Sequence, residues 1–168
     1  MVNIKRCFIH TFMPPWRWRL AFSPATLKAI EQAVKSSETR HSGELRFAIE
    51  NALAPASVWQ GLTGRQRATE VFSNLHVWDT EENSGVLIYV LLADREVHIV
   101  ADRGINRRVA ASEWEAIAGS MQQAFKSGEF LRGSLAGIEA ITSLLAAYFP
   151  ATAINPNELA DTPVIVNT

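Results

Sequence analysis

The stretch that decides the fold is residues 77–105, VWDTEENSGVLIYVLLADREVHIVADRGI. Its middle part, residues 86–92, is a run of seven apolar residues rich in Val, Ile and Tyr. A run of this length is too short for a long helix and is typical of a strand buried on both faces. The turn at residues 93–95 ends the run. Apolar residues then alternate at positions 97, 99 and 101, which predicts a second, adjacent strand.

Helix signals surround these two strands. Ser23 followed by Pro24 is a good helix start, because Ser caps the N-terminus and Pro fits the first turn. Residues 112–115, SEWE, form a capping box that predicts Ser112 as the N-cap of a later helix. The predicted helices cover residues 24 to about 40, 64–75, 113–127 and 131–148.

A third strand is expected at residues 44–52, and residues 164–166 read as an extended segment. The order α-β-α-β-β-α-α predicts an α/β fold with a central sheet and helices packed on it. We expect three parts along the chain: a basic aromatic arm at residues 1–22, the domain at residues 23–150 and a C-terminal tail at residues 151–168.

Charge is distributed unevenly along a chain of ordinary composition. With 168 residues, of which 48% are hydrophobic and 20% charged, the chain is long enough for one domain with a full core. The net charge of −1 gives no whole-chain reason to expect a nucleic-acid partner. Residues 1–30 hold five basic residues and no acid, whereas the rest, with 11 basic and 17 acidic residues, has a net charge of −6. A basic arm therefore precedes an acidic domain.

Export and membrane-spanning signals are weak. Cys7 is the only cysteine, so an intrachain disulfide and a Cys-based metal cluster are excluded. Basic and proline residues interrupt the apolar stretch that a signal peptide needs. The best membrane-spanning candidate, residues 135–149, is short and contains Glu139. We therefore expect no signal peptide and no transmembrane helix. The expected location is the cytoplasm, which includes the inner face of the membrane.

Several segments between residues 24 and 149 resemble the TPM domain, which occurs in thylakoid-lumen photosystem repair proteins and in bacterial envelope proteins. The resemblance rests on GELRF at 43–47, VWD at 77–79, NSGVLI at 83–88, the Asp94-Arg95 turn and Gly104-Ile105. It implies an αβα sandwich with a small mixed central sheet and helices packed on both faces. It also implies acidic loops that bind calcium in some relatives and an acid phosphatase activity reported for others. The Asp102-Arg103 pair departs from the glycine that many relatives have there.

The acidic turn at residues 79–83 is the candidate metal site. Asp79, Glu81 and Asn83 alternate, so their oxygens can face one hard cation. Asp102, at the end of the next strand, can return to the same end of the sheet. We therefore expect Ca²⁺ or Mg²⁺ at these four residues, and no organic cofactor. The alternative is a solvated acidic loop in which Asp79 caps a turn.

Arginine and tryptophan side chains are candidate contacts for an anion or a partner. Arg103, Arg107 and Arg108 surround a glycine turn and can bind an anion, unless nearby carboxylates neutralise them. Trp16 and Trp18 belong to the arm, which can lie on an anionic membrane surface or contact a protein partner such as a membrane protein. The alternative for the arm is a strap whose aromatic residues pack on the domain's own helices.

We expect a TPM-like binding or assembly module that binds a divalent cation and associates with a membrane. One alternative is a metal-dependent acid phosphatase, with Asp79 and Asp102 on the metal and Arg103 on the phosphate. Phosphatase activity rests on the resemblance alone, because the chain has no cysteine-based phosphatase loop. The other alternative is a metal-free protein-interaction domain. We also expect Trp78 to be buried where the acidic turn joins the core.

Overall fold

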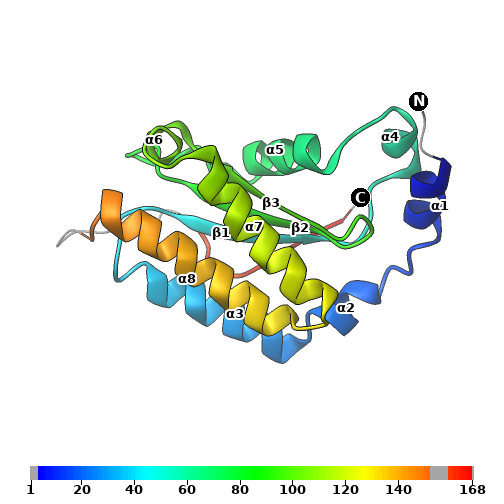
Figure 1. Ribbon diagram of the computed structural model, residues 1–168, viewed down its shortest axis with the longest axis horizontal. Helices are drawn as coiled ribbons and strands as arrows, with labels where there is room; N and C mark the ends of the chain where they lie inside the picture. Colours follow the sequence, from blue (N-terminus) through cyan, green and yellow to red (C-terminus); the bar gives the residue numbers. More distant parts are fainter. Residues whose placement is uncertain (1–3, 152–158, 168) are drawn as a thin grey trace.

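A four-stranded mixed sheet lies at the centre of the computed structural model, which describes residues 4–151 and 159–167 (Figure 1). Its strands are β1 (Leu45–Glu50), β2 (Val86–Leu91), β3 (Glu96–Ala101) and β4 (Val164–Val166), in the spatial order β3-β2-β1-β4. β1 runs parallel to both β2 and β4, and β3 is antiparallel to β2. Every residue of β1 and β2 is buried, so the prediction of a doubly covered strand is confirmed.

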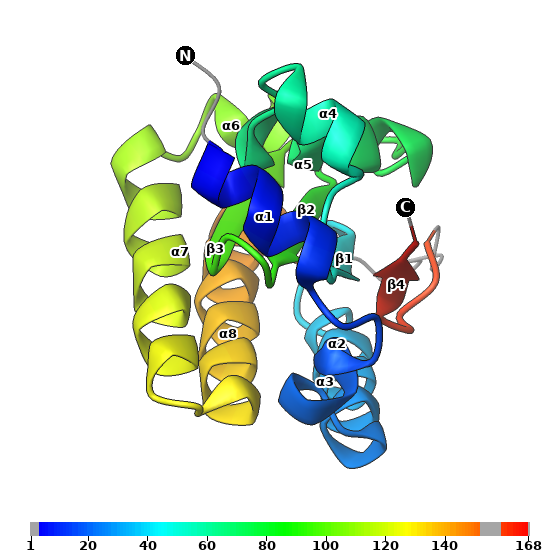
Figure 2. The same cartoon turned by 90° about the vertical axis from the view of Figure 1, so that its right-hand side faces the viewer.

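Helices cover both faces of this sheet (Figures 1 and 2). One layer contains α3 (Pro24–Ser37), α7 (Ala111–Lys126) and α8 (Phe130–Tyr148); the other contains α4 (Pro55–Trp59) and α5 (Gly64–Asn74). The expected αβα sandwich with a small mixed sheet is therefore confirmed.

Alternating strand residues supply two separate cores. Phe47 and Ile88 pack toward the α3–α7–α8 layer, whereas Leu87 and Tyr89 pack toward α4 and α5. Successive side chains of a strand point to opposite faces. A strand covered on both faces therefore needs an apolar residue at nearly every position, which explains the continuous run at residues 86–92. Full burial of each large side chain contributes about 1.5–3 kcal/mol.

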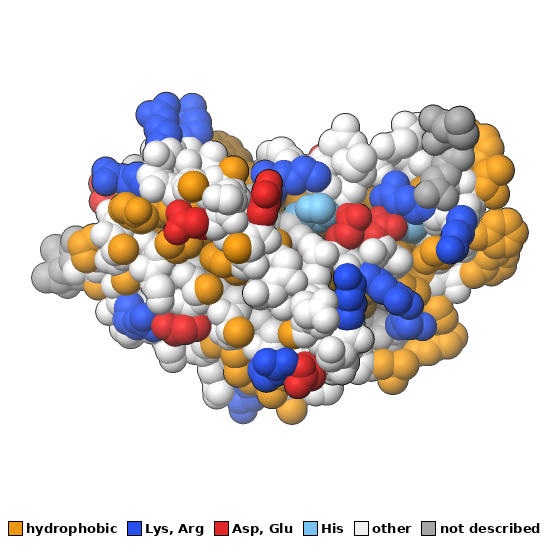
Figure 3. Space-filling view, viewed as in Figure 1, with side chains coloured by type: hydrophobic (Ala, Val, Ile, Leu, Met, Phe, Trp, Pro, Cys, Tyr) orange, Lys and Arg blue, Asp and Glu red, His pale blue; other side chains and the backbone are white. Residues whose placement is uncertain are grey.

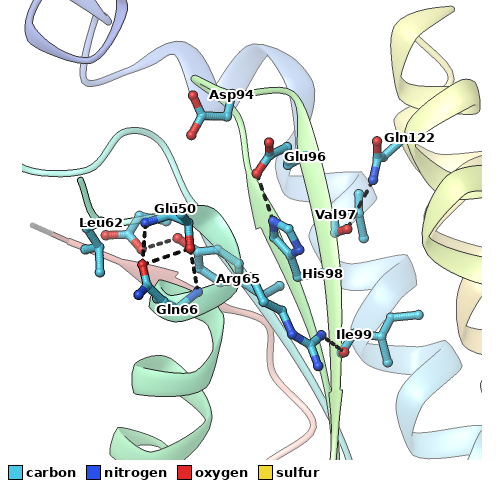
Figure 4. A network of polar contacts seen from close by, with 12 residues as sticks. Glu50, Leu62, Arg65, Gln66, Asp94, Glu96, Val97, His98, Ile99 and Gln122 are labelled. Atoms are coloured by element: carbon cyan, nitrogen blue, oxygen red, sulfur yellow. Dashed lines mark hydrogen bonds and ion pairs between the residues drawn. The ribbon is translucent and has the colours of Figure 1, made fainter. Parts of the chain in front are cut away.

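Helix side chains also cover the free edge of the sheet at β3 (Figure 4). Arg65 Nη1, from α5, donates to the Ile99 carbonyl at 2.5 Å. Gln122 Nε2, from α7, donates to the Val97 carbonyl at 3.2 Å. Carbonyl groups on an edge strand are otherwise available to a foreign strand. The opposite edge is β4, which has only three residues.

Short helices also form outside the helices that the sequence predicts. α1 (Ile4–Phe12) and α2 (Arg17–Ala21) lie within the arm, on either side of Pro14 and Pro15, and α6 (Arg103–Asn106) follows β3. The arm is thus two short helices separated by a proline break.

The predicted start of α7 is wrong by two residues. Its N-cap is Ala110 rather than Ser112, because Glu113 Oε2 accepts a hydrogen bond from the backbone N–H of Ala110. One of the two hydrogen bonds of the predicted capping box is therefore present, from the Ala110 N–H to the Glu113 carboxylate. The second is missing, because alanine has no hydroxyl to accept a hydrogen bond from the first turn.

Among the described residues, α8 alone is long and apolar enough to cross a membrane by length and composition. In this fold α8 packs against α3 and α7. Ile138, Ile141 and Leu145 on its inner side belong to the core.

Candidate functional site

The acidic turn lies at the end of the sheet where β2 begins and β3 ends. Asp79 and Glu81 are exposed, whereas Asn83 is half-buried and adopts a left-handed conformation with φ of 53°. Asp102 directly follows β3 and caps α6. The fold thus brings the predicted ligands from two separate segments to one end of the sheet.

Backbone hydrogen bonds hold these two segments together. The Asn83 carbonyl accepts from the Gly104 N–H at 2.9 Å, and the Gly85 carbonyl accepts from the Asp102 N–H at 2.8 Å. A Cβ atom at Gly104 would lie 2.5 Å from the carbonyl oxygens of both Glu82 and Asn83. Only glycine fits so close to backbone atoms. The expected return of Asp102 to the acidic turn is therefore observed.

The Asp102 carboxylate is only partly satisfied. The residue is 6% exposed, and its Oδ1 accepts from the Arg103 N–H at 2.7 Å. Its Oδ2 is buried without a hydrogen-bond partner among the described residues, and so is the Ser84 hydroxyl oxygen. An unpartnered buried carboxylate oxygen is costly, and a hard cation is the ligand that satisfies it. Both atoms belong to the segments that meet at this end of the sheet.

The four predicted ligands do not form one compact cluster. In the described part of the chain, no group of three or more His, Cys, Asp or Glu side chains is placed to hold a metal ion. Glu82, which the alternating pattern passes over, accepts a hydrogen bond from the hydroxyl of Ser42. The fold brings together the segments of Asn83 and Asp102, while Asp79 lies on the exposed side of the turn.

The expectation that Trp78 is buried is wrong, because its side chain is 49% exposed. Val77 enters the core instead. The Val77 carbonyl oxygen lies 1.9 Å from where a Cβ of Gly85 would be, so the chain passes tightly over that glycine. The left-handed His76 precedes this close approach, with φ of 54°, and Trp78 then faces outward with its ring 6.1 Å from the His76 ring.

Arg103 begins α6, Arg107 and Arg108 directly follow it, and all three are exposed. The Arg108 guanidinium lies over the Phe149 ring at 5.6 Å. The two nearby carboxylates, Asp102 and Glu113, accept hydrogen bonds from backbone N–H groups. The described contacts of these two acids are thus with backbone rather than with the arginine side chains.

A second polar network, which the sequence pattern does not indicate, lies at the opposite end of the sheet. Glu50, at the end of β1, is fully buried. Arg67 Nε and Nη2 donate to its two oxygens at 3.0 Å each, and the Tyr89 hydroxyl donates to Oε2 at 2.5 Å. Burial and the Glu50 charge raise the pKa of Tyr89. The only sequence signal for this network is one acid at the end of an apolar strand.

This network is satisfied internally and therefore serves the fold. Arg67 also donates to Glu70 at 3.0 Å, and the hydrogen bond to Glu50 raises the pKa of the Arg67 guanidinium. A buried carboxylate with a bidentate arginine and a hydroxyl has no unmet hydrogen-bonding need. Asp102, whose Oδ2 has no partner among the described residues, is therefore a better candidate than Glu50 for binding an external ligand.

Comparison with known proteins identifies a family and a fold for this chain. A family model described as the TPM domain matches residues 20–144. No curated protein matches the chain. The NMR structure of the BA42 protein from the psychrophilic bacterium Bizionia argentinensis matches with a TM-score of 0.76 and 33% identity, covering 86% of this chain and 95% of that chain. The N-terminal domain of a P. gingivalis protein matches with a TM-score of 0.61 and 16% identity, covering 76% and 78%, and supports the fold alone.

Proposed function

Since the chain belongs to the TPM domain family, we propose that it is a binding and assembly module whose acidic end takes a divalent cation, Ca²⁺ or Mg²⁺. The observation that carries the proposal is the buried Asp102 Oδ2, which has no hydrogen-bond partner among the described residues. A cation there would satisfy this oxygen and link the loop after β3 to the turn before β2. The linked loops would present an ordered surface to a protein partner.

The remaining oxygen ligands would come from the acidic turn. Asn83 is the nearest candidate, because its backbone carbonyl already receives the Gly104 N–H from the Asp102 loop. Asp79 and Glu81 would contribute from the exposed side. Carboxylate, amide and carbonyl oxygens are the ligands that Ca²⁺ and Mg²⁺ prefer.

The proposal includes a position at the cytoplasmic face of the inner membrane, beside a membrane protein. What supports this position is the N-terminal arm, which combines four basic residues in residues 1–22, no acid and several aromatic side chains. Basic and aromatic residues together are typical of segments at a membrane interface.

A thermal-shift titration with Ca²⁺, Mg²⁺, Mn²⁺ and EDTA tests the cation site. A ligand at about 100 times its Kd stabilises a fold by about 2.7 kcal/mol, so the melting temperature should rise by several degrees. Asp102→Asn should abolish the rise and Asp79→Ala should reduce it. Glu115→Gln, an exposed change on α7, should leave it intact. No rise at millimolar cation would overturn the cation site and favour a metal-free interaction domain.

A second candidate is a metal-dependent phosphatase, which Arg103 favours. Its exposed guanidinium directly follows Asp102, and arginine suits the oxygens of a phosphate ester. A bound cation would supply Lewis-acid assistance to the phosphoryl group. Hydrolysis of p-nitrophenyl phosphate that needs the cation and falls at least about tenfold in Arg103→Ala would support this candidate. No turnover under the conditions that give the thermal shift would exclude it.

A further inference from the structure

An apolar stripe runs along the outer side of the N-terminal arm. It consists of residues at intervals of four, all more than half exposed: Ile4, Phe8, Phe12, Trp16 and Leu20. Figure 3 shows hydrophobic side chains gathered at the end of the molecule that carries α1 and α2. Large exposed apolar surfaces mark interaction sites on proteins.

The other side of α1 is fixed to the domain. Arg6 Nη2 donates to Asp94 Oδ2 at 2.7 Å, and His10 Nε2 contacts Asp94 Oδ1 at 3.0 Å. The Leu53 N–H donates to His10 Nδ1 at 2.8 Å, so Nε2 carries the ring proton and donates to Asp94. His10 is 4% exposed. The stripe therefore faces outward because polar residues anchor the inner side of the helix.

A cleft of about 420 Å³ opens beside the stripe, between α2, the turn of the β2–β3 hairpin and the end of α7. Apolar residues line much of it, including Leu20 of the stripe and the half-buried Phe125. Three exposed cations also line it, namely Arg17, Arg95 and Lys126. Its one acid, Glu96, contacts His98 Nε2 at 2.8 Å (Figure 4).

The three cleft cations form no ion pair with another described residue. Cationic groups beside an apolar lining fit an amphiphile that has an anionic head and an apolar body. The neighbouring stripe extends the apolar part of this surface along the arm.

We propose that the stripe and the cleft together dock the protein on an anionic phospholipid bilayer. The apolar stripe would enter the interfacial region, and the cleft cations would bind phosphate groups of the lipid heads. This inference rests on the part of the proposed function that places the module beside a membrane, and it is independent of the cation site at the other end of the sheet.

Charge and shape favour a bilayer over other occupants. A second copy of the chain would bring the basic patch of Lys5, Arg17 and Arg19 against the same basic patch in a symmetric contact. Hydrophobic side chains form part of one end of the molecule (Figure 3), and such an end suits a flat and deformable surface. Trp and Arg are side chains that favour the lipid–water interface.

Co-sedimentation with vesicles tests the proposal, with EDTA present so that no cation bridges protein and lipid. Wild type should bind mixed phosphatidylcholine–phosphatidylglycerol vesicles, bind pure phosphatidylcholine weakly, and dissociate at high salt. Phe8→Ala/Phe12→Ala and Arg17→Ala/Lys126→Ala should each weaken binding by about tenfold or more.

Two matched controls carry the same chemical change elsewhere. Trp78→Ala/Tyr148→Ala removes two exposed aromatics outside the arm, and Lys35→Ala/Arg40→Ala removes two exposed cations outside the cleft. Both should bind vesicles within about twofold of wild type, and circular dichroism should show every variant folded.

The outcomes separate the surface from the rest of the proposed function. Binding by wild type that neither test variant weakens would overturn the stripe and cleft while leaving membrane association intact. Equal losses in the test and control variants would overturn the specific surface as well. If wild type does not sediment with anionic vesicles, both the surface and the membrane position fall, and an acidic protein partner becomes the explanation to test. The cation titration decides the acidic end separately.

Discussion

Asp94 and Arg6, 88 residues apart in the sequence, form a bidentate ion pair that joins the N-terminal arm to the β2–β3 turn. Arg6 Nε lies 3.0 Å from Asp94 Oδ1, and Arg6 Nη2 lies 2.7 Å from Asp94 Oδ2. His10 Nε2 adds a third contact to Asp94 Oδ1 at 3.0 Å. Burial alone would raise the pKa of Asp94. Hydrogen bonds from His10 and Arg6 outweigh burial and lower the pKa to about 2.

This low pKa predicts that acid releases the arm. Because the folded pKa lies below the ordinary value of 3.8, the stabilisation is complete above about pH 4 and is lost as the pH falls toward 2. Urea unfolding across this window should show a loss of about 2 kcal/mol attributable to Asp94, and amide exchange in α1 should accelerate. Asp94→Asn should remove this pH dependence and be less stable at pH 7. A pH profile shared by Asp94→Asn and wild type would contradict the assignment, with exposed Asp79→Asn as the control.

The Glu50 network predicts unequal losses of stability when Arg67, Glu70 and Tyr89 are each truncated. Arg67→Ala leaves a fully buried Glu50 without its bidentate partner and should destabilise the fold by about 3–5 kcal/mol. Glu70→Ala removes the half-exposed contact of the same arginine and should cost less than about 1 kcal/mol. Tyr89→Phe should fall between them, at about 1–2 kcal/mol. Urea denaturation measures the loss in free energy of unfolding for all three variants. Equal losses would show that the cost does not depend on the burial of Glu50.

Local patterns explain why the sheet was predictable. The run at residues 86–92 and the alternation that follows it are dictated by burial within a few neighbouring residues, and both strands form there. β4 could be predicted only as an extended segment, because its parallel partner, β1, lies more than a hundred residues earlier. Pairing over such a distance leaves no local signature.

The arm and the buried polar groups were not predictable for a related reason. In α1 the apolar residues face outward, while Arg6 and His10 face the domain, which reverses the usual amphipathic pattern. The anchors that select this orientation are Asp94 and Leu53, both remote in sequence. At the candidate site, the meeting of Asp102 with the acidic turn was predictable from strand direction. The unsatisfied Ser84 and the outward turn of Trp78 depend on backbone packing around Gly85.

Glu38, at the C-terminal end of α3, predicts a pH effect of opposite sign. Burial, a hydrogen bond with Asp161 and the charges of Asp161 and Glu44 raise its pKa to about 8. Because the folded pKa lies above the ordinary value of 4.5, the folded state favours the protonated acid, and this contribution declines as the pH rises from about 4.5 to 8. Glu38→Gln should therefore flatten the decline and raise the melting temperature at pH 8. Exposed Glu115→Gln serves as the control, and parallel melting curves for wild type and Glu38→Gln would refute the effect.

Gly104 and Gly119 offer a matched test of the contact that builds the candidate cation site. A methyl group at Gly104 would meet two backbone carbonyl oxygens at 2.5 Å, whereas at Gly119, within α7, it would meet nothing within 4 Å. Gly104→Ala should cost about 1–3 kcal/mol in urea denaturation, because the acidic turn must move away from the Asp102 loop. Gly119→Ala should stabilise the fold by up to about 1 kcal/mol through helix propensity alone. If the cation links these two loops, Gly104→Ala should also weaken the Ca²⁺-dependent rise in melting temperature, while Gly119→Ala should preserve it. A destabilised Gly104→Ala that keeps the full Ca²⁺ response would place the cation away from this contact.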